Sequence, residues 1–182
     1  MAKQKRAVES KPSISVVGAG RLGTALAVAL EASGYRIEAL VARQLGRAHK
    51  AAGLFAQRPL ALSASQLDKL PESHLILITT PDDAITTAAD RLAVIQKPQG
   101  RSRMGRTVLH TSGALSSAAL SPLSAAGFQV GSLHPLVSVS DPVSGQLNLR
   151  GAFYCLEGDR LALRVARAVV RDLGGKSFSV DP

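Results

Sequence analysis

The chain has 182 residues, enough for one domain with a full hydrophobic core. Its hydrophobic content of 46% and charged content of 19% are typical of a globular protein, and no apolar run approaches a membrane span, so no membrane partner is expected. The net charge of +9 suits an anionic small ligand as well as nucleic acid. Because the basic residues are scattered and aromatic residues make up only 3%, we expect no nucleic-acid partner.

The N-terminal segment 1–12 carries charges but no apolar stretch behind them. This composition predicts a flexible basic tail rather than a secretory signal, with one domain over 13–182. The single cysteine, Cys155, cannot form an internal disulfide, which suits a reducing compartment. A cytoplasmic location is therefore expected.

A glycine-rich motif directly follows the first predicted strand. Residues 14–17 form a short apolar run of the length that a buried strand takes, and the next letters, GAGRLG, match G-x-G-x-x-G. Apolar residues at helical spacing then continue to Gly34, which is suited to end a helix. The alternative is a glycine-rich turn that binds nothing, but the flanking strand and helix favour a dinucleotide site. The pyrophosphate is predicted to be held by the backbone N–H groups of Gly18, Ala19, Gly20, Arg21 and Leu22.

The rest of the chain alternates between apolar runs and helical patterns. Strands are predicted over 36–42, 59–62, 75–80, 107–110, 129–133, 153–156 and 177–180. Helices are predicted over 44–52, 81–95, 115–126 and 160–173, with a polar loop over 97–105 and a long loop over 134–151. This alternation predicts an α/β fold, a doubly wound and mostly parallel Rossmann sheet flanked by helices.

The end of the second predicted strand indicates which nucleotide binds. Glu38 has the nominal spacing of an NAD-type acid, but it falls early in the strand, whereas ligands lie outside the carboxyl ends of strands. Arg43 stands at the carboxyl end, with Arg47 following. A guanidinium there suits the 2′-phosphate of NADP, so NADP is predicted in preference to NAD. The alternative is that both arginines are only solvated charges at the start of a helix.

Other strand ends carry polar residues that would meet in the same crevice. Thr80, Pro81 and Ser112 are predicted to line the nicotinamide side, although Ser112 could instead cap a turn. His110 and His134 are the candidate catalytic acid or base, the alternative being a structural role. No metal site is expected, because one cysteine and four histidines stand at wide spacing.

Several segments together resemble a known family. They are VVGAGRLGTALAVAL, LITTPDDAI, LHTSGAL, GSLHPL, GAFYCLEGD and LGGKSFSVD. They are similar to uncharacterised two-domain proteins with a Rossmann-like NADP-oxidoreductase domain and a following helical domain, related to pyrroline-5-carboxylate reductase, prephenate dehydrogenase and 6-phosphogluconate dehydrogenase. The resemblance implies a nicotinamide-nucleotide fold but no particular substrate.

Two functions follow as alternatives. The first is the NADP(H)-binding domain of an oxidoreductase that transfers hydride to or from a small carbonyl or imine substrate. The second is a non-catalytic sensor or scaffold that binds the nucleotide. Since relatives continue into a helical domain and this sequence stops at Pro182, we expect a homodimer or a separate helical partner. The chain alone is expected to bind nucleotide weakly and to turn over no substrate.

Overall fold

Eight strands form one sheet in the computed structural model, which describes residues 11–95 and 106–180. The strand order is β3-β2-β1-β4-β5-β6-β7-β8, and only the β6–β7 pair in this sheet is antiparallel. The predicted Rossmann-type α/β fold is therefore confirmed. The strands are β1 Ile14–Val17, β2 Ile37–Ala42, β3 Leu60–Ser63, β4 Leu75–Ile78, β5 Thr107–His110, β6 Gln129–Pro135, β7 Phe153–Gly158 and β8 Lys176–Ser179.

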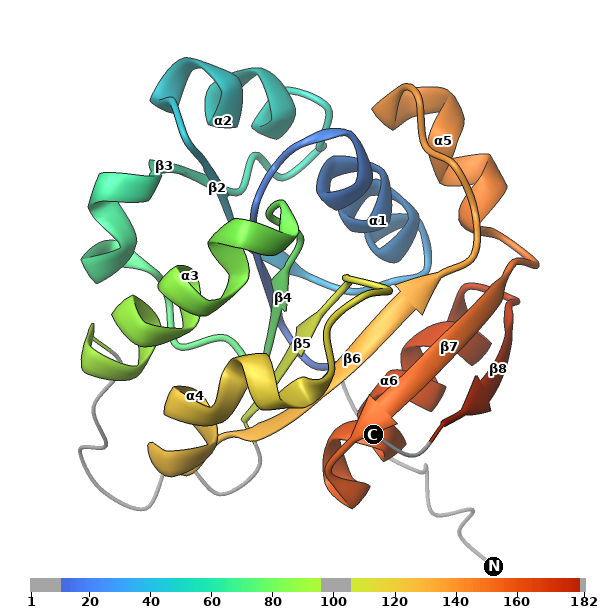
Figure 1. Ribbon diagram of the computed structural model, residues 1–182. Helices are drawn as coiled ribbons and strands as arrows, with labels where there is room; N and C mark the ends of the chain where they lie inside the picture. Colours follow the sequence, from blue (N-terminus) through green and yellow to red (C-terminus); the bar gives the residue numbers. More distant parts are fainter. Residues whose placement is uncertain (1–10, 96–105, 181–182) are drawn as a thin grey trace, which may run out of the picture.

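Helices cover both faces of the sheet, giving three layers (Figure 1). One face carries α1 Arg21–Ala32, α2 Leu45–Ala52, α5 Pro142–Leu149 and α6 Arg160–Asp172. The other carries the 3₁₀ helix η1 Ala64–Lys69, α3 Asp82–Ile95, the 3₁₀ helix η3 Ser117–Leu120 and α4 Ser121–Ala125. The strand order reverses between β1 and β4, so the carboxyl ends of these strands border the crevice where this fold binds ligands.

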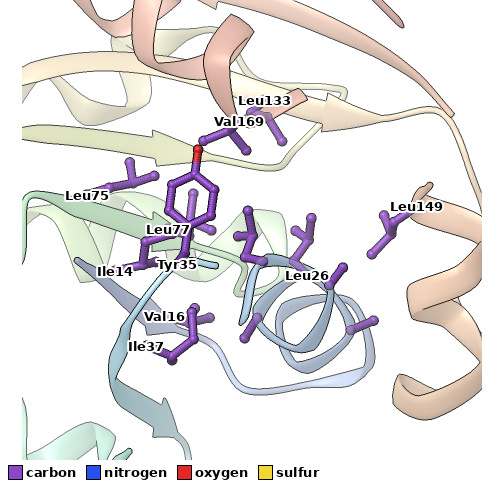
Figure 2. Close-up of a cluster of buried hydrophobic side chains, with 14 of the residues drawn as sticks. Ile14, Val16, Leu26, Tyr35, Ile37, Leu75, Leu77, Leu133, Leu149 and Val169 are labelled. Carbon is purple, nitrogen blue, oxygen red and sulfur yellow. The ribbon is translucent and has the colours of Figure 1, made fainter. Parts of the chain in front are cut away.

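Each face of the sheet has its own hydrophobic core. Leu75 and Leu77 of β4 point to the α1 side, while Ile76 and Ile78 point to the α3 side, and all four are buried. Figure 2 shows the α1-side core, in which Leu26 of α1 and Val169 of α6 lie among strand residues. Burial on both faces explains why this strand reads as an unbroken apolar run.

The prediction of a loop over 134–151 is wrong. His134 and Pro135 extend β6, and residues from Pro142 onward form α5, which packs on α1. Asp141 caps this helix, because its Oδ1 accepts hydrogen bonds from the backbone N–H groups of Val143 and Ser144 at 2.9 and 3.0 Å. Proline at the first position of a helix supports a helix start rather than breaking one.

Three other sequence predictions concern the segments 115–126, 97–105 and 1–12. The predicted helix over 115–126 is present as η3 followed by α4, with Pro122 in the first turn of α4. The predicted polar loop over 97–105 and most of the predicted N-terminal tail lie outside the described residues. At the end of that tail, the Lys11 ammonium donates to the Ser33 carbonyl and pairs with Asp172 at 2.7 Å.

Candidate functional site

Two of the motif glycines are required by packing within the protein. Gly18 has φ +114°, and a Cβ there would lie 2.6 Å from backbone atoms of Thr79 and Thr80. A Cβ on Gly23 would lie 2.3 Å from the Gly18 carbonyl oxygen and closer still to the Thr79 hydroxyl. That hydroxyl donates to the Gly18 carbonyl at 2.7 Å. These contacts bring the turn, the start of α1 and the end of β4 together at the strand-order reversal.

Gly20 differs, because no contact within residues 11–95 and 106–180 requires its lack of a side chain. Its φ of −84° is open to any residue, and the nearest atom to an added Cβ is the Gly18 carbonyl oxygen, 3.9 Å away. Gly20 is also the N-cap of α1, and no side chain caps that helix end. An uncapped helix start with open space before it is the arrangement that receives a phosphate group.

The backbone donors of the motif are partly used within the protein. The N–H groups of Gly18 and Ala19 donate to the Val41 carbonyl at 2.8 and 2.7 Å, and that of Gly20 donates to the Gly18 carbonyl at 2.6 Å. Of the five predicted donors, those of Arg21 and Leu22 lie in the first turn of α1, where N–H groups have no intrahelical partner. These two are the donors that the turn leaves for an anion.

Gly23→Ala is expected to lower the free energy of unfolding by about 1–3 kcal/mol, because the new methyl overlaps a backbone carbonyl. The matched control is Gly46→Ala in α2, where an added Cβ meets nothing within 4 Å. That control should stabilise the chain by about 0.5–1 kcal/mol, the helix-propensity difference. Urea denaturation measures the free energy of unfolding of both variants. Equal changes in Gly23→Ala and Gly46→Ala would contradict the conclusion that packing requires a glycine at position 23 but not at position 46.

The region after β2 is basic. Arg43 and Arg47 are exposed, and no salt bridge joins either one to a carboxylate within residues 11–95 and 106–180. Glu38, by contrast, is engaged by Arg36 and by the Ser73 hydroxyl at the amino-terminal side of the sheet. Its structural contacts agree with its exclusion as a ribose ligand.

Of the remaining predicted lining residues, Thr80 and Pro81 follow β4 and Ser112 follows β5. Pro81 is exposed, while the Thr80 hydroxyl is buried and has no hydrogen-bond partner among the described residues. The Ser112 hydroxyl accepts from the backbone N–H groups of Ala114 and Leu115 at 3.1 and 3.2 Å, so it caps the turn that it begins. Ser112 thus makes the turn-capping contacts that the sequence left as an alternative, and because its hydroxyl still has a hydrogen to donate, the ligand-lining role stays a prediction.

His134, near the end of β6, is oriented by the segment that follows β5. Its Nδ1 lies 3.0 Å from the Thr111 carbonyl oxygen. A carbonyl only accepts, so Nδ1 carries the hydrogen and the neutral ring presents the Nε2 lone pair. The ring also packs against Gly113, where an added Cβ would lie 2.5 Å from Nε2. His134 is half-buried, which gives this structure one histidine that a ligand can approach at the strand ends.

His110 is in a different environment. The side chain is fully buried, and its Nε2 lies 3.1 Å from the Ser116 carbonyl oxygen. Its Nδ1 has no hydrogen-bond partner in the part of the chain that the structure describes. Burial lowers the pKa of the ring, while the Ser116 carbonyl and the charge of Glu157 act in the opposite direction. A substrate cannot touch a side chain with no exposed surface, so the burial of His110 argues against its predicted catalytic role. Of the two predicted catalytic histidines, His134 is the one that a substrate could contact.

Acid is expected to destabilise the protein through His110. The unfolded chain binds a proton at the ordinary histidine pKa of about 6.5, and the folded chain binds it only at lower pH. The free energy of unfolding therefore falls as pH drops below about 6.5, until the folded pKa is passed. Urea denaturation between pH 7.5 and 5 should give a flatter profile for His110→Gln than for the native chain. His49→Gln, at an exposed position on α2, is the control, and an unchanged slope in His110→Gln would contradict the assignment.

Sequence reasoning missed one polar residue beside this site. Glu157 of β7 is 5% exposed, and its carboxylate accepts from the Ser117 N–H and from the Ser117 hydroxyl, each at 2.6 Å. The available signal was an acidic residue inside an otherwise apolar strand, FYCLEG. The helix predicted over 81–95 is present as α3, with Asp82 and Asp83 in its first turn.

Two searches of the described residues give negative results. Within 11–95 and 106–180, no group of three or more His, Cys, Asp and Glu side chains is placed to hold a metal ion. In the same residues, no helix combines the length and the apolar character that crossing a bilayer requires.

Comparison with solved structures finds similar folds in dehydrogenases and reductases. Prephenate dehydrogenase from Aquifex aeolicus, solved with NAD+ and hydroxyphenyl propionate, has a TM-score of 0.76 at 18% identity, covering 97% of this chain and 62% of that one. A Bacteroides fragilis protein assigned as an NADP oxidoreductase gives 0.74 at 19%, covering 94% and 61%. Pyrroline-5-carboxylate reductase from Coxiella burnetii gives 0.68 at 14%, covering 93% and 58%.

These likenesses show the fold, and the chain spans 58% to 62% of the length of the three neighbours. Comparison with curated proteins gives no match. The model of the Rossmann-like domain matches residues 3–135, which include the glycine motif, the end of β2 and the strand ends that carry His110 and His134. The chain therefore belongs to the Rossmann-like domain family.

Proposed function

We propose that this chain is the NADP(H)-binding domain of an oxidoreductase that acts on a small carbonyl or imine substrate. The observation that carries the proposal is that an added Cβ on Gly20 would meet only the Gly18 carbonyl oxygen at 3.9 Å among the described residues, at an uncapped helix start beside the strand-order reversal. The α1 N-terminus would receive the pyrophosphate through the N–H groups of Arg21 and Leu22. The exposed guanidinium of Arg43 would take the 2′-phosphate.

On the other side of the crevice, the residues after β4 and β5 would border the nicotinamide. When bound, the cofactor supplies hydride transfer at C4 of the nicotinamide. His134 would move the accompanying proton at Nε2, since the Thr111 carbonyl keeps the hydrogen of the neutral ring on Nδ1. Gly113 backs the ring on one side and so limits its rotation.

A second candidate function is nucleotide binding without turnover. It is favoured by the use of the Ser112 hydroxyl as a turn cap and of His110 as a buried donor, which leaves few free polar groups beside His134. Stopped-flow turnover with small carbonyl and imine substrates, in native chain and in His134→Asn, separates the two. Turnover that His134→Asn abolishes would support the enzyme, whereas nucleotide binding without turnover in the self-associated chain, in which a second layer covers the site, would favour the sensor.

Both candidate functions require the chain to bind a nicotinamide nucleotide. A fluorescence titration with NADPH, with NADH and with buffer tests this binding. We expect saturable binding of both nucleotides, tighter for NADPH. No binding of either nucleotide by the folded chain would contradict both candidate functions.

We also propose that a second apolar layer completes the site, from another copy of the chain or from a helical partner. In register, His134 of β6 lies opposite Cys155 of β7, and Cys155 lies beside Phe178 of β8. Phe153 and Phe178 are 53% and 45% exposed on this side of the sheet. Exposed apolar side chains continuous with a candidate site are typical of an interaction surface.

Self-association through this surface is expected in gel filtration of the chain alone, with dimers or larger species. Phe178→Lys should shift the elution toward the monomer, because a charge on the surface opposes its burial. The exposed Val94→Lys on α3 is the control and should elute like the native chain. A native chain that stays monomeric at all concentrations would count against a self-associating layer.

A further inference from the structure

One row of register-paired residues, followed from strand to strand across the sheet, is apolar at one end and polar at the other. In register, Val17 of β1 lies beside Ile78 of β4, and Ile78 lies beside His110 of β5. His110 is then paired with Ser132 of β6, and Ser132 with Glu157 of β7. The first two are ordinary core residues, whereas the last three are polar and no more than 6% exposed. Burying a carboxylate is costly, so the contacts it makes there need an explanation.

The two end residues of this polar row, His110 and Glu157, both form hydrogen bonds at the start of η3. The Glu157 carboxylate uses one oxygen for the Ser117 N–H and the other for the Ser117 hydroxyl, each at 2.6 Å. His110 donates from Nε2 to the carbonyl of the preceding residue, Ser116, at 3.1 Å. The two buried side chains thus fix consecutive residues of the backbone.

The segment held in this way is also the one that orients His134. At its beginning, the Thr111 carbonyl accepts from His134 Nδ1 at 3.0 Å. In its middle, Gly113 lies so close to the ring that an added Cβ would be 2.5 Å from Nε2. The Ser112 hydroxyl closes the turn between these two contacts. A small displacement of the η3 end would therefore change both contacts of the imidazole.

We propose that Glu157 is a positioning residue, which acts through Ser117 and the 111–116 segment to keep His134 in the Nδ1–H tautomer with Nε2 free. The inference rests on the proposed function only in taking His134 as the group that transfers the proton. It assigns a role to the acidic residue of the FYCLEG strand, whose side chain never reaches the crevice itself.

The test is ¹⁵N NMR of the histidine side chains in the full chain, without nucleotide, at a pH where His134 is neutral. The native chain should show His134 as the Nδ1–H tautomer. Glu157→Gln removes the negative charge: the amide oxygen can still accept the Ser117 N–H and the NH₂ can donate to the Ser117 hydroxyl, but both bonds lose their charge assistance. We therefore expect a less firmly held segment and a mixture of tautomers for His134. Ser117→Ala removes one of the two bonds and should give a smaller change in the same direction, while Ser117→Thr, which keeps the hydroxyl, should resemble the native chain.

Asp159→Asn is the matched control, since the Asp159 carboxylate also accepts a backbone N–H, that of Val130 at 2.8 Å, but does not touch the 111–117 segment. It should lower the melting temperature without changing the His134 signals. Native-like His134 signals in Glu157→Gln, or an equal change in Asp159→Asn, would overturn the proposal. If Glu157→Gln does not fold, Ser117→Ala decides, and native His134 signals in that variant would overturn it. Because no nucleotide is present, this outcome is independent of whether the chain binds NADP(H).

Discussion

Gly20→Val is expected to abolish NADPH binding while the protein stays folded. The backbone of Gly20 has a conformation that valine adopts readily, and the space around an added Cβ is free of protein atoms apart from the Gly18 carbonyl oxygen at 3.9 Å. A branched side chain would nevertheless fill the space in front of the α1 N-terminus, where the pyrophosphate is proposed to lie. The expected result is therefore loss of the ligand without loss of the fold.

Fluorescence titration with NADPH and a circular dichroism melt together test this separation. Gly46→Val, at an exposed glycine of α2 with no atom within 4 Å of an added Cβ, is the matched control and should bind NADPH like the native chain. A folded Gly20→Val protein with native affinity for NADPH would move the nucleotide site to another part of the molecule.

Arg43→Asp is expected to invert the nucleotide preference from NADPH toward NADH. A hydrogen bond to a charged phosphate contributes about 1.5–3 kcal/mol, so its loss should weaken NADPH binding by about 10-fold or more. The introduced carboxylate adds repulsion to the 2′-phosphate. NADH lacks that phosphate and should lose far less affinity.

Isothermal titration calorimetry with both nucleotides measures the change in preference. Arg36→Asp is the control, because Arg36 precedes β2 at the amino-terminal side of the sheet and pairs with Glu38 there. An equal loss of affinity for NADPH and NADH in Arg43→Asp would exclude contact between Arg43 and the 2′-phosphate.

Local patterns were enough to predict most elements of this fold. The fifth strand lies exactly over 107–110 as predicted, because its apolar run is short and bounded by polar residues. The strand–glycine–helix unit was predicted because its glycines directly follow an apolar strand run and precede a helical pattern. That Gly18 and Gly23 also pack against the end of β4 could not be read from this local pattern. The helix after Asp141 was missed because proline was weighed as a breaker, although at a helix start it is favoured.

The candidate site was harder to predict, because its roles depend on strand neighbours. Whether His110 is buried depends on η3 covering it, and the partner of Glu157 depends on the antiparallel register of β6 and β7. Likewise, the N–H groups of Gly18 and Ala19 are used by Val41, a residue of the adjacent strand. Spacing along one chain indicates which residues reach the strand ends, but not which of their polar groups are already hydrogen-bonded.

We propose above all that a nicotinamide nucleotide lies across the carboxyl ends of β1, β2 and β4. The most direct measurement is amide ¹H–¹⁵N NMR of the labelled chain during titration with NADPH. We expect the largest shifts on 18–23, on Arg43 and its neighbours, and on 79–82, with little change in β8. Shifts confined to α6, whose exposed face carries Arg160, Arg164, Arg167 and Arg171, would instead indicate nonspecific binding of the anion and would contradict the claim.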